Sequence, residues 1–385
     1  MQSFAQSLIL DLPREEAVNL YLRATTVQDN PLQARLGLID WNFGVDKMKM
    51  LHLRSNSANL QPKRGCAEWN PTVRAGLDAD TIRVTDYEVN GEQCPDEFNV
   101  GTSRLLRGPL GQGEAPGVPD PLTNALLTML RRSLAGDLYD VVYFSDENIR
   151  QDIAATAYPD SPVLRERFLT MLEQQSGIWP EIIARTTTTN KSAKIAYVDS
   201  NDGTAAGNAT RAENIADFFD DMAAAASPEL ANWHQSNQQG TFDKPVFLVQ
   251  TGLWRAYKKY LRTLGTEIAH QFILDGEIMR DTLMHDGYLV VHVPEWEAHD
   301  RKAGRATVGN MSTTQRALFT VLGNITGLAN MNDIEGQPGR GLAIQRSPLL
   351  KDKGKMYMYA DYGIGMGVAQ PELMVASYNS STNFA

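Results

Sequence analysis

The chain has 385 residues, enough for one large domain or for two to three smaller ones. With 42% hydrophobic and 21% charged residues, it has the composition of a folded soluble protein. The formal net charge of −10 argues against a protein that holds DNA or RNA on a basic face, because an acidic surface repels phosphates.

Cysteine content and targeting signals bear on the compartment. The two cysteines, Cys66 and Cys94, cannot by themselves form a four-cysteine zinc site. Such a low count suits a reducing compartment and favours two free thiols, although the sequence leaves their pairing open. The N-terminal stretch lacks a basic n-region, and no apolar run approaches the ~20 residues of a membrane span. We therefore expect a cytoplasmic protein without a membrane partner.

The first predicted element is a short helix at residues 11–23. Asp11 is placed to cap it, Pro13 lies in its first turn, and Glu15 and Glu16 complement the positive end of the helix dipole. The segment has few apolar residues. We expect it to pack against the body of the protein or against a neighbouring molecule.

Residues 40–106 change to strand periodicity. The stretches "KMKMLHLRS" (47–55) and "TIRVTDYEV" (81–89) alternate apolar and polar residues, which is typical of strands with one solvated face. The intervening residues are rich in Gly, Pro, Asn and Asp. This pattern predicts a long, projecting β-hairpin or loop system with little core of its own.

A Gly/Pro-rich connector at 107–121 precedes the strongest predicted helix. Asp120 caps this helix, and an apolar stripe continues to about Phe144. A second helix is predicted at 162–175, opened by Ser161 and Pro162 and closed by Gly177.

Residues 186–265 have an α/β pattern. A strand at 194–198 is followed by a helix whose capping box is formed by Thr210 and Glu213. A strand at 245–250 then leads into a helix at 252–264, which Gly265 terminates. The predicted buried stripe of this helix consists of Leu253, Tyr257, Leu261 and Leu264, and its outward-facing cations are Lys258, Lys259 and Arg262.

The last third of the chain alternates apolar runs with turns. A buried strand at 288–296 is ended by Pro294, an apolar run follows at 316–329, and the tail at 355–378 predicts two strands. The glycines of "GIGMG" (363–367) lack the spacing of a dinucleotide site. We interpret them as positions that ease turns or close backbone packing in a sheet.

Motifs that would indicate catalysis are scarce. The chain contains no Gly-x-Ser-x-Gly and no His-Glu-x-x-His sequence. His285, His292 and His299 are spaced seven apart, with His292 in a predicted strand and the other two in predicted loops. We interpret them as surface or interface histidines and not as metal ligands. The sequence thus predicts no catalytic residue, no cofactor site, no metal site and no enzymatic activity.

Four segments carry a resemblance to a known family: "PVFLVQTGLWRAYKKYLRTLG" (245–265), "YLVVHVPEWEAHD" (288–300), "RALFTVLGNITGLANMND" (316–333) and "KMYMYADYGIGMGVAQPEL" (355–373). With the order of parts around them, they resemble the major capsid proteins of tailed bacteriophages, which have the Hong Kong 97-type fold. The resemblance extends from about residue 119 to 378.

The resemblance implies an α+β fold with five parts. These are an N-terminal arm (1–40), an extended β-hairpin or E-loop region (41–106), a peripheral domain with a long spine helix from 121 to about 144 (107–185), an axial α/β domain (186–330) and a C-terminal β-return (331–385).

The function that the resemblance implies is assembly. Many copies form pentamers and hexamers of an icosahedral shell, which encloses double-stranded DNA without sequence-specific binding. The protein is then a virion component assembled in the host cytoplasm. Portal, scaffold and decoration proteins are additional partners that this interpretation allows.

Three alternatives remain open at the level of the sequence. One is an encapsulin-like compartment that encloses cargo protein. A second is a soluble α/β hydrolase with a site near His292 and Glu295. The third is a tail-tube or baseplate protein, which would form stacked rings. Closed shells in electron micrographs, and their loss on deletion of about 55–80, would distinguish the shell proteins from the other two.

Overall fold

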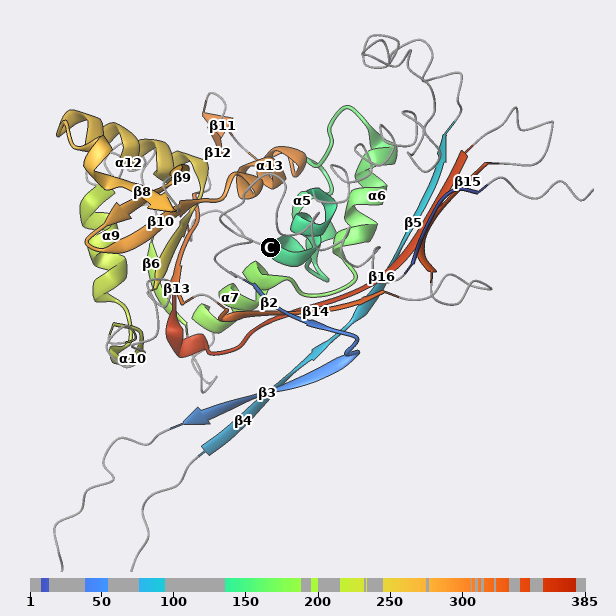
Figure 1. The fold of residues 1–385 in the computed structure, drawn as a ribbon, viewed down its shortest axis with the longest axis horizontal. Helices are drawn as coiled ribbons and strands as arrows, with labels where there is room; N and C mark the ends of the chain where they lie inside the picture. The colour runs from blue at the N-terminus through green and yellow to red at the C-terminus, as the bar shows by residue number, and fades with distance from the viewer. Residues whose placement is uncertain are drawn as a thin grey trace, which may run out of the picture.

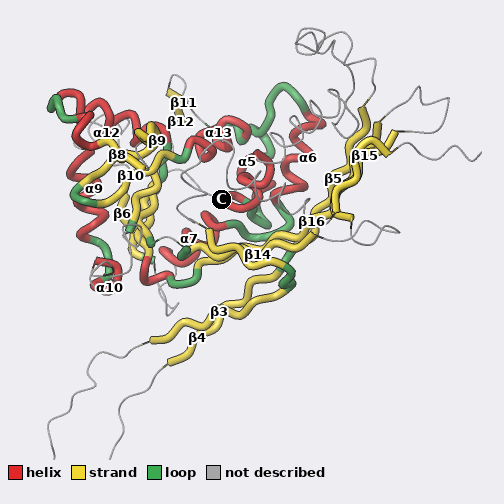
Figure 2. The backbone as a smooth tube through the Cα atoms, viewed as in Figure 1, coloured by secondary structure: helices red, strands yellow, loops and turns green. Residues whose placement is uncertain are grey.

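The computed structural model combines β-sheets with a layer of helices (Figures 1 and 2). It describes residues 8–13, 39–54, 76–93, 136–187, 195–199, 215–231, 233, 245–274, 277–305, 307–308, 311–312, 315–321, 323–331, 340–346 and 356–378. Within these residues the larger sheets have six and seven strands, and helices lie between them in Figure 1.

The six-stranded sheet is built around one long strand, β16 (Met356–Val368). Part of β16 pairs antiparallel with β14 (Ile325–Met331) and another part with β15 (Arg340–Arg346), while β5 (Thr85–Gln93) also pairs antiparallel with β16. β1 (Leu8–Pro13) adds to β15, and β2 (Ile39–Phe43) pairs parallel to β14. Segments far apart in the sequence therefore meet in this sheet.

The seven-stranded sheet has the order β6-β17-β13-β7-β10-β9-β8. Its strands are β6 (Ala196–Asp199), β17 (Met374–Tyr378), β13 (Ala317–Thr320), β7 (Val246–Val249), β10 (Tyr288–His292), β9 (Glu277–His285) and β8 (Gln271–Leu274). Every residue of β7, β13 and β17 is buried, as expected for strands covered on both faces.

Helices α9 (Ile215–Ala224) and α12 (Thr251–Thr263) pack on this sheet and share one apolar cluster with it. Leu253, Tyr257 and Leu261 lie on the buried face of α12. The helix ends in a Schellman motif, in which Gly265 has a φ of +69° and its N–H donates to the Arg262 carbonyl at 3.0 Å. Local signals and tertiary packing agree along this helix.

The other helices surround a second apolar cluster that touches both sheets. Residues 136–144 are helical, followed by α5 (Ile149–Ile153), α6 (Pro162–Leu172), α7 (Ile178–Thr187) and α13 (Pro294–Lys302). The remaining short elements are α10 (Pro228–Ala231), the 3₁₀ turns η1 (Glu267–His270) and η3 (Pro371–Leu373), and the strand pair β11 (Thr307–Val308) and β12 (Met311–Ser312).

Several predicted elements are confirmed. The Ser161 hydroxyl caps α6 by accepting from the Leu164 N–H, and Pro162 opens the helix. The strand–helix unit at 245–264 is β7 followed by α12, and Pro294 follows β10 as the first residue of α13. The apolar run at 316–329 divides into β13 and β14. The tail forms β16 and β17.

The prediction of a helix at 11–23 is wrong over its first residues. Asp11 and Pro13 belong to β1, which pairs antiparallel with β15 from Leu8 opposite Gln345 to Pro13 opposite Arg340. Leu8, Leu10 and Leu12 alternate, and the ladder offered by β15 prevails over the local capping pattern. The remaining residues of that prediction lie outside the described ranges.

Two single-residue predictions are also corrected. Leu264 is 55% exposed, because it is the C-cap of α12 and the apolar stripe ends one turn earlier. Gly177 does not close α6. It precedes α7 and donates its N–H to the Ser145 carbonyl at 2.6 Å, where an added Cβ would lie 2.8 Å from the Ser145 nitrogen. Gly177 therefore permits a close backbone approach.

Several predictions lie outside the described residues. They are the thiols Cys66 and Cys94, the connector at 107–121, the capping box of Thr210 and Glu213, and residues 121–135 of the predicted spine helix.

Candidate functional site: the projecting hairpin and a buried polar network

A long hairpin leaves the body of the molecule (Figure 1). β3 (Lys47–Arg54) pairs antiparallel with β4 (Gly76–Arg83), from Lys47 opposite Arg83 to Arg54 opposite Gly76. Among the described strands these two form a sheet of their own. Because a two-stranded ribbon is at best marginally stable in water, this hairpin is a surface suited to being covered by another molecule. The predicted strand at 47–55 is confirmed as β3. The predicted strand at 81–89 divides at Val84: its first residues end β4, and the others belong to β5, which pairs with β16. The second hairpin strand begins at Gly76, within the stretch predicted as a loop.

The base of the hairpin is fixed to the six-stranded sheet. Ile82 is 4% exposed and packs with Leu328 of β14. The Val84 N–H donates to the Asp46 carbonyl at 3.0 Å, and the Asn330 amide donates to the Asp46 carboxylate at 2.6 Å. The hairpin therefore leaves the body in a defined direction.

Two glycines of "GIGMG" allow the chain of β4 and β5 to cross close to β16. A Cβ on Gly363 would lie 2.3 Å from the Val84 side chain, and one on Gly365 would lie 2.4 Å from the Arg83 carbonyl oxygen. The prediction of close backbone packing in a sheet is confirmed.

A buried polar network joins α13 to the strands β7 and β13. The Arg316 guanidinium binds both oxygens of Asp300, at 2.8 and 2.9 Å, and both residues are fully buried. The Gln250 amide donates to Asp300 at 2.7 Å and to Glu297 at 3.1 Å. Although burial raises it, the charge and hydrogen bonds of Arg316 bring the pKa of Asp300 below its ordinary value. This network pairs the buried charges of Asp300 and Arg316 and attaches α13 to the seven-stranded sheet.

A second buried group connects α13 to the helix at 136–144. His299 Nδ1 lies 2.9 Å from an Asp140 oxygen, and Lys302 binds the other oxygen. Burial lowers the pKa of His299 below its ordinary value, even though Asp140 and Asp300 raise it. A carboxylate only accepts, so the neutral ring carries its proton on Nδ1. For Lys302, the charge of Asp140 raises the pKa despite burial.

The three evenly spaced histidines lie in separate environments. His292 ends β10, bonds to the Thr251 hydroxyl at 3.0 Å and stacks on Trp254. His285 ends β9 and bonds to Asp220 at 2.9 Å. His299 lies within α13 and is only 1% exposed, so its prediction as a surface histidine in a loop is wrong. The placement of His285 in a loop is also wrong. The described residues contain no cluster of His, Cys, Asp and Glu that could hold a metal ion.

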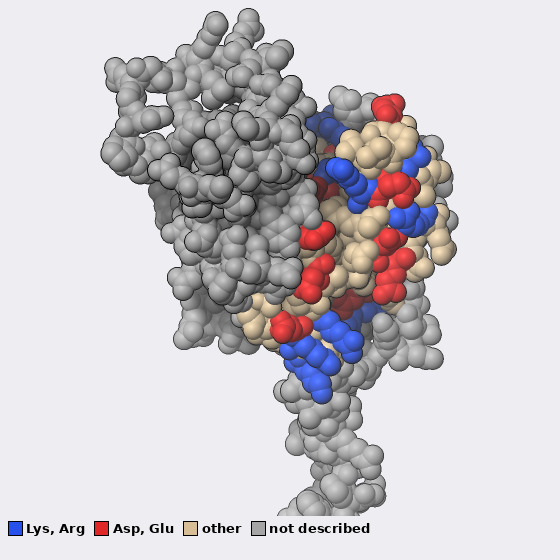
Figure 3. Space-filling model, turned by 90° about the vertical axis from the view of Figure 1, so that its right-hand side faces the viewer, with Lys and Arg blue, Asp and Glu red and all other residues tan. Residues whose placement is uncertain are grey.

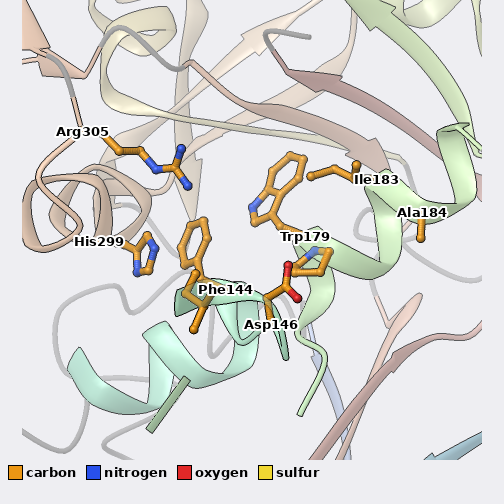
Figure 4. A pocket seen from close by; sticks show the side chains of 9 residues that line it. Phe144, Asp146, Trp179, Ile183, Ala184, His299 and Arg305 are labelled. Carbon is orange, nitrogen blue, oxygen red and sulfur yellow. The ribbon is translucent and has the colours of Figure 1, made fainter. Parts of the chain in front are cut away.

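A cavity of about 170 Å³ lies beside α7 and α13 (Figure 4). Its lining residues are Phe144, Asp146, Ile149, Trp179, Pro180, Ile183, Ala184, His299 and Arg305. Burial and the charge of Arg316 lower the pKa of Arg305 to about 10. The walls are mostly apolar and include no serine, cysteine or threonine that could act as a nucleophile. His292 and Glu295, the proposed hydrolase residues, are not among them.

Sequence reasoning missed the network of Gln250, Asp300 and Arg316. The available signal was weak: Arg316 directly precedes a fully buried strand, and Gln250 directly follows one. A polar residue at the boundary of a buried strand requires a partner, but the sequence does not say which one.

Comparisons with known proteins concern the fold. No protein-family model and no curated protein sequence matches the chain. Solved structures do match. The capsid of the native GTA particle is 14% identical, over 98% of this chain and 95% of that one, with a TM-score of 0.41. The matching chain in the structure of Mycobacterium phage Ogopogo is 12% identical, over 90% of this chain and 91% of that one, with a TM-score of 0.47.

The holo-SrpI encapsulin complex from Synechococcus elongatus PCC 7942 is 11% identical, over 98% of this chain and 99% of that one, with a TM-score of 0.43. Structures similar to this chain are thus mostly phage capsids, together with an encapsulin shell. Among the described residues, no helix is both long and apolar enough to cross a bilayer.

Proposed function

We propose that this chain is the major capsid protein of a tailed bacteriophage, and that many copies assemble into an icosahedral shell around double-stranded DNA. The observation that carries the proposal is the β3–β4 hairpin, a separate two-stranded sheet that projects from a well-packed body. A two-stranded sheet needs a further strand or a packed surface to be stable, and a neighbouring copy that covers the hairpin supplies it.

The domain division proposed with this function keeps the bounds predicted from the sequence. Residues 1–40 form the arm, 41–106 the E-loop region, 107–185 the peripheral domain, 186–330 the axial domain and 331–385 the β-return. Contacts between different patches on successive copies close into rings when the rotation between copies fits, and such rings can tile a shell. The acidic charge of the chain suits a wall that packed DNA does not adhere to.

The test shortens the hairpin in register. Because Leu51 lies opposite Ala79, residues 51–79 can be replaced by Asn-Gly between Met50 and Asp80, which leaves four cross-strand pairs closed by a tight turn. We expect a folded subunit with an unchanged urea unfolding midpoint that no longer forms closed shells in electron micrographs. The control replaces only residues 55–75 by a Gly/Ser segment of the same length. Because it keeps both paired strands, it separates their loss from the loss of the sequence between them.

Three results would contradict the proposal. Normal shells from the shortened variant would remove the hairpin from the assembly mechanism. A stable small oligomer of the unaltered chain at high concentration would show that the chain does not form a shell. Closed shells that contain protein cargo and no DNA when isolated from the native host would replace the phage head by an encapsulin-like compartment.

A further inference from the structure

A cluster of three cations lies at the base of the hairpin. Lys47, Lys49 and Arg83 are exposed, and Lys47 stands directly opposite Arg83 in the ladder. In an antiparallel pair, residues directly opposite each other have their side chains on the same face, and Lys49 lies two residues along on that face. Figure 3 shows Lys and Arg side chains gathered where the hairpin leaves the body.

These cations make no ion pair in the part of the chain that the structure describes. The nearest carboxylate in the sequence, Asp46, accepts a hydrogen bond from the Asn330 amide. Like charges directly opposite in a ladder destabilise it. Within one subunit, the arrangement of Lys47 and Arg83 is therefore unfavourable, and an acidic partner would relieve it.

The whole chain has a net charge of −10, and without these three cations the rest of it is more negative still. Another copy of the chain can therefore supply the acidic partner. Helix α9, "IADFFDDMAA", contains no Lys or Arg, and its residues Asp217, Asp220 and Asp221 are exposed. They are three and four residues apart, which places them on one face of the helix. Within the subunit, Asp220 bonds to His285.

The two charged surfaces lie at different places on the molecule. In Figure 1, α9 lies on the side of the seven-stranded sheet that faces away from the six-stranded sheet, whereas the hairpin base lies beneath the six-stranded sheet. A cluster on one copy can therefore meet α9 only on another copy. Contacts of this kind join unlike patches and are those from which rings are built.

We propose that Lys47, Lys49 and Arg83 at the hairpin base bind the acidic face of α9 on a neighbouring copy. This inference rests on the proposed function and names the charges that meet at one subunit contact. Charge complementarity of this kind sets which patches pair and in which register.

The experiment is a charge exchange. Lys47→Glu with Lys49→Glu places two carboxylates at the hairpin base, and Asp217→Lys with Asp221→Lys places two ammonium groups on α9. Each pair of changes alone brings like charges together, so the protein concentration for half-maximal shell assembly should rise by about tenfold or more. All four changes in one chain restore the attraction, and assembly should return to within about threefold of the unaltered protein.

The matched control is Arg167→Glu with Lys259→Glu. It makes the same change in net charge at two other exposed cations that have no ion pair among the described residues. We expect at most about a threefold change in the assembly concentration. A carboxylate at position 47 faces Arg83, so the hairpin variant should unfold at the same or a higher urea concentration, and lost assembly is then not lost folding.

The outcomes separate this inference from the proposed function. If the unaltered chain forms shells and the Lys47/Lys49 variant forms them equally well, the inference is overturned and the function stands. Normal shells that lose their DNA would assign the cluster to phosphate binding instead. If the Lys47/Lys49 variant assembles poorly and the added α9 changes do not restore assembly, the pairing with α9 is overturned. An unaltered chain that forms no shells would overturn both proposals.

Discussion

The seven-stranded sheet and the β3–β4 hairpin differ in how their strands are covered. In the sheet, β7, β13 and β17 are buried throughout, and α9 and α12 share an apolar cluster with it. In the hairpin, Ile82 at the base is buried, and the two strands pair with no third described strand. The first region is stabilised within the subunit, whereas the second is the region for which we propose contacts with another copy.

The contrast extends to charge. In the sheet region, Arg316 and Asp300 are fully buried and bind each other. At the hairpin base, Lys47 and Arg83 stand opposite each other in solvent. Complementary charges are thus arranged inside the folded body, and like charges at the exposed base. Under the proposed function, this difference separates a body specified for folding from a hairpin specified for association.

The largest expected effect concerns the buried charges. Asp300→Ala removes the carboxylate that binds Arg316 and leaves that guanidinium buried. Breaking a buried pair in this way costs about 3–5 kcal/mol, because one charge stays uncompensated. Urea unfolding followed by circular dichroism should show that loss in the free energy of unfolding.

The matched surface change is Arg150→Ala. Arg150 binds Glu166 at 2.9 Å and also Glu173, but its side chain is 41% exposed. We expect a much smaller loss than for Asp300→Ala, because water screens exposed pairs. Equal losses for the two variants would contradict the distinction between the buried network and the surface.

The next effect concerns the junction of the two regions. Gly365→Ala places a Cβ 2.4 Å from the Arg83 carbonyl oxygen, so β4 must shift away from β16. Overpacking of this kind costs about 1–3 kcal/mol of the free energy of unfolding. The same urea titration measures it.

Gly136→Ala is the control for that substitution. The site is helical, and the nearest atom to an added Cβ is the Lys302 ammonium nitrogen at 3.5 Å, an ordinary contact. Alanine there should be neutral or stabilising by up to about 1 kcal/mol. If Gly365→Ala were as harmless as Gly136→Ala, the close approach of β4 to β16 would not be needed for stability.

The same contrast explains how far the sequence could predict the fold. Helix α12 was predictable because its stripe of Leu253, Tyr257 and Leu261 and the terminating Gly265 are local signals that tertiary packing reinforces. The first hairpin strand, β3, was predictable from alternation, whereas β4 begins at Gly76, ahead of the strand predicted at 81–89. Their register, which sets Lys47 opposite Arg83, was not, because alternation fixes the face of a residue but not its partner.

The failures share a dependence on distant partners. Asp11 looked like a helix cap, but β15, more than 300 residues further along the chain, draws its segment into a ladder. Gln250 and Asp300 are 50 residues apart and bond at 2.7 Å, a pairing that no local pattern encodes. Residues of the candidate surface were thus predictable in type, and their contacts were not.

A smaller effect should appear in the pH dependence of the body. Burial lowers the pKa of His299 below 6.5, so between that value and its folded-state pKa the unfolded chain binds the proton and the folded chain does not. Stability is therefore fully present above about pH 6.5 and declines as the pH falls from there through the lower folded-state pKa. The charges that face the ring are those of Asp140, Asp300 and Arg305.

Urea titrations between pH 8 and pH 5 on the unaltered protein and on His299→Gln measure this decline. Because the amide does not titrate, the variant should be less stable at pH 8 but lose less stability on acidification. Parallel curves would show that other groups account for the acid sensitivity and that His299 exchanges its proton equally in both states.

The smallest expected effect concerns the exposed apolar end of α12 and η1. Ile268 is 83% exposed, so Ile268→Ser should change the free energy of unfolding by no more than about 0.5 kcal/mol. Leu261, 1% exposed in the same region, provides the contrast, because its replacement by alanine should cost about 2–5 kcal/mol. A large loss for Ile268→Ser would mean that the side chain is covered within the subunit. If instead stability is unchanged and shell assembly weakens, the body also presents an apolar contact to other copies. Folding and association are then less cleanly separated between body and hairpin than the burial of β7, β13 and β17 suggests.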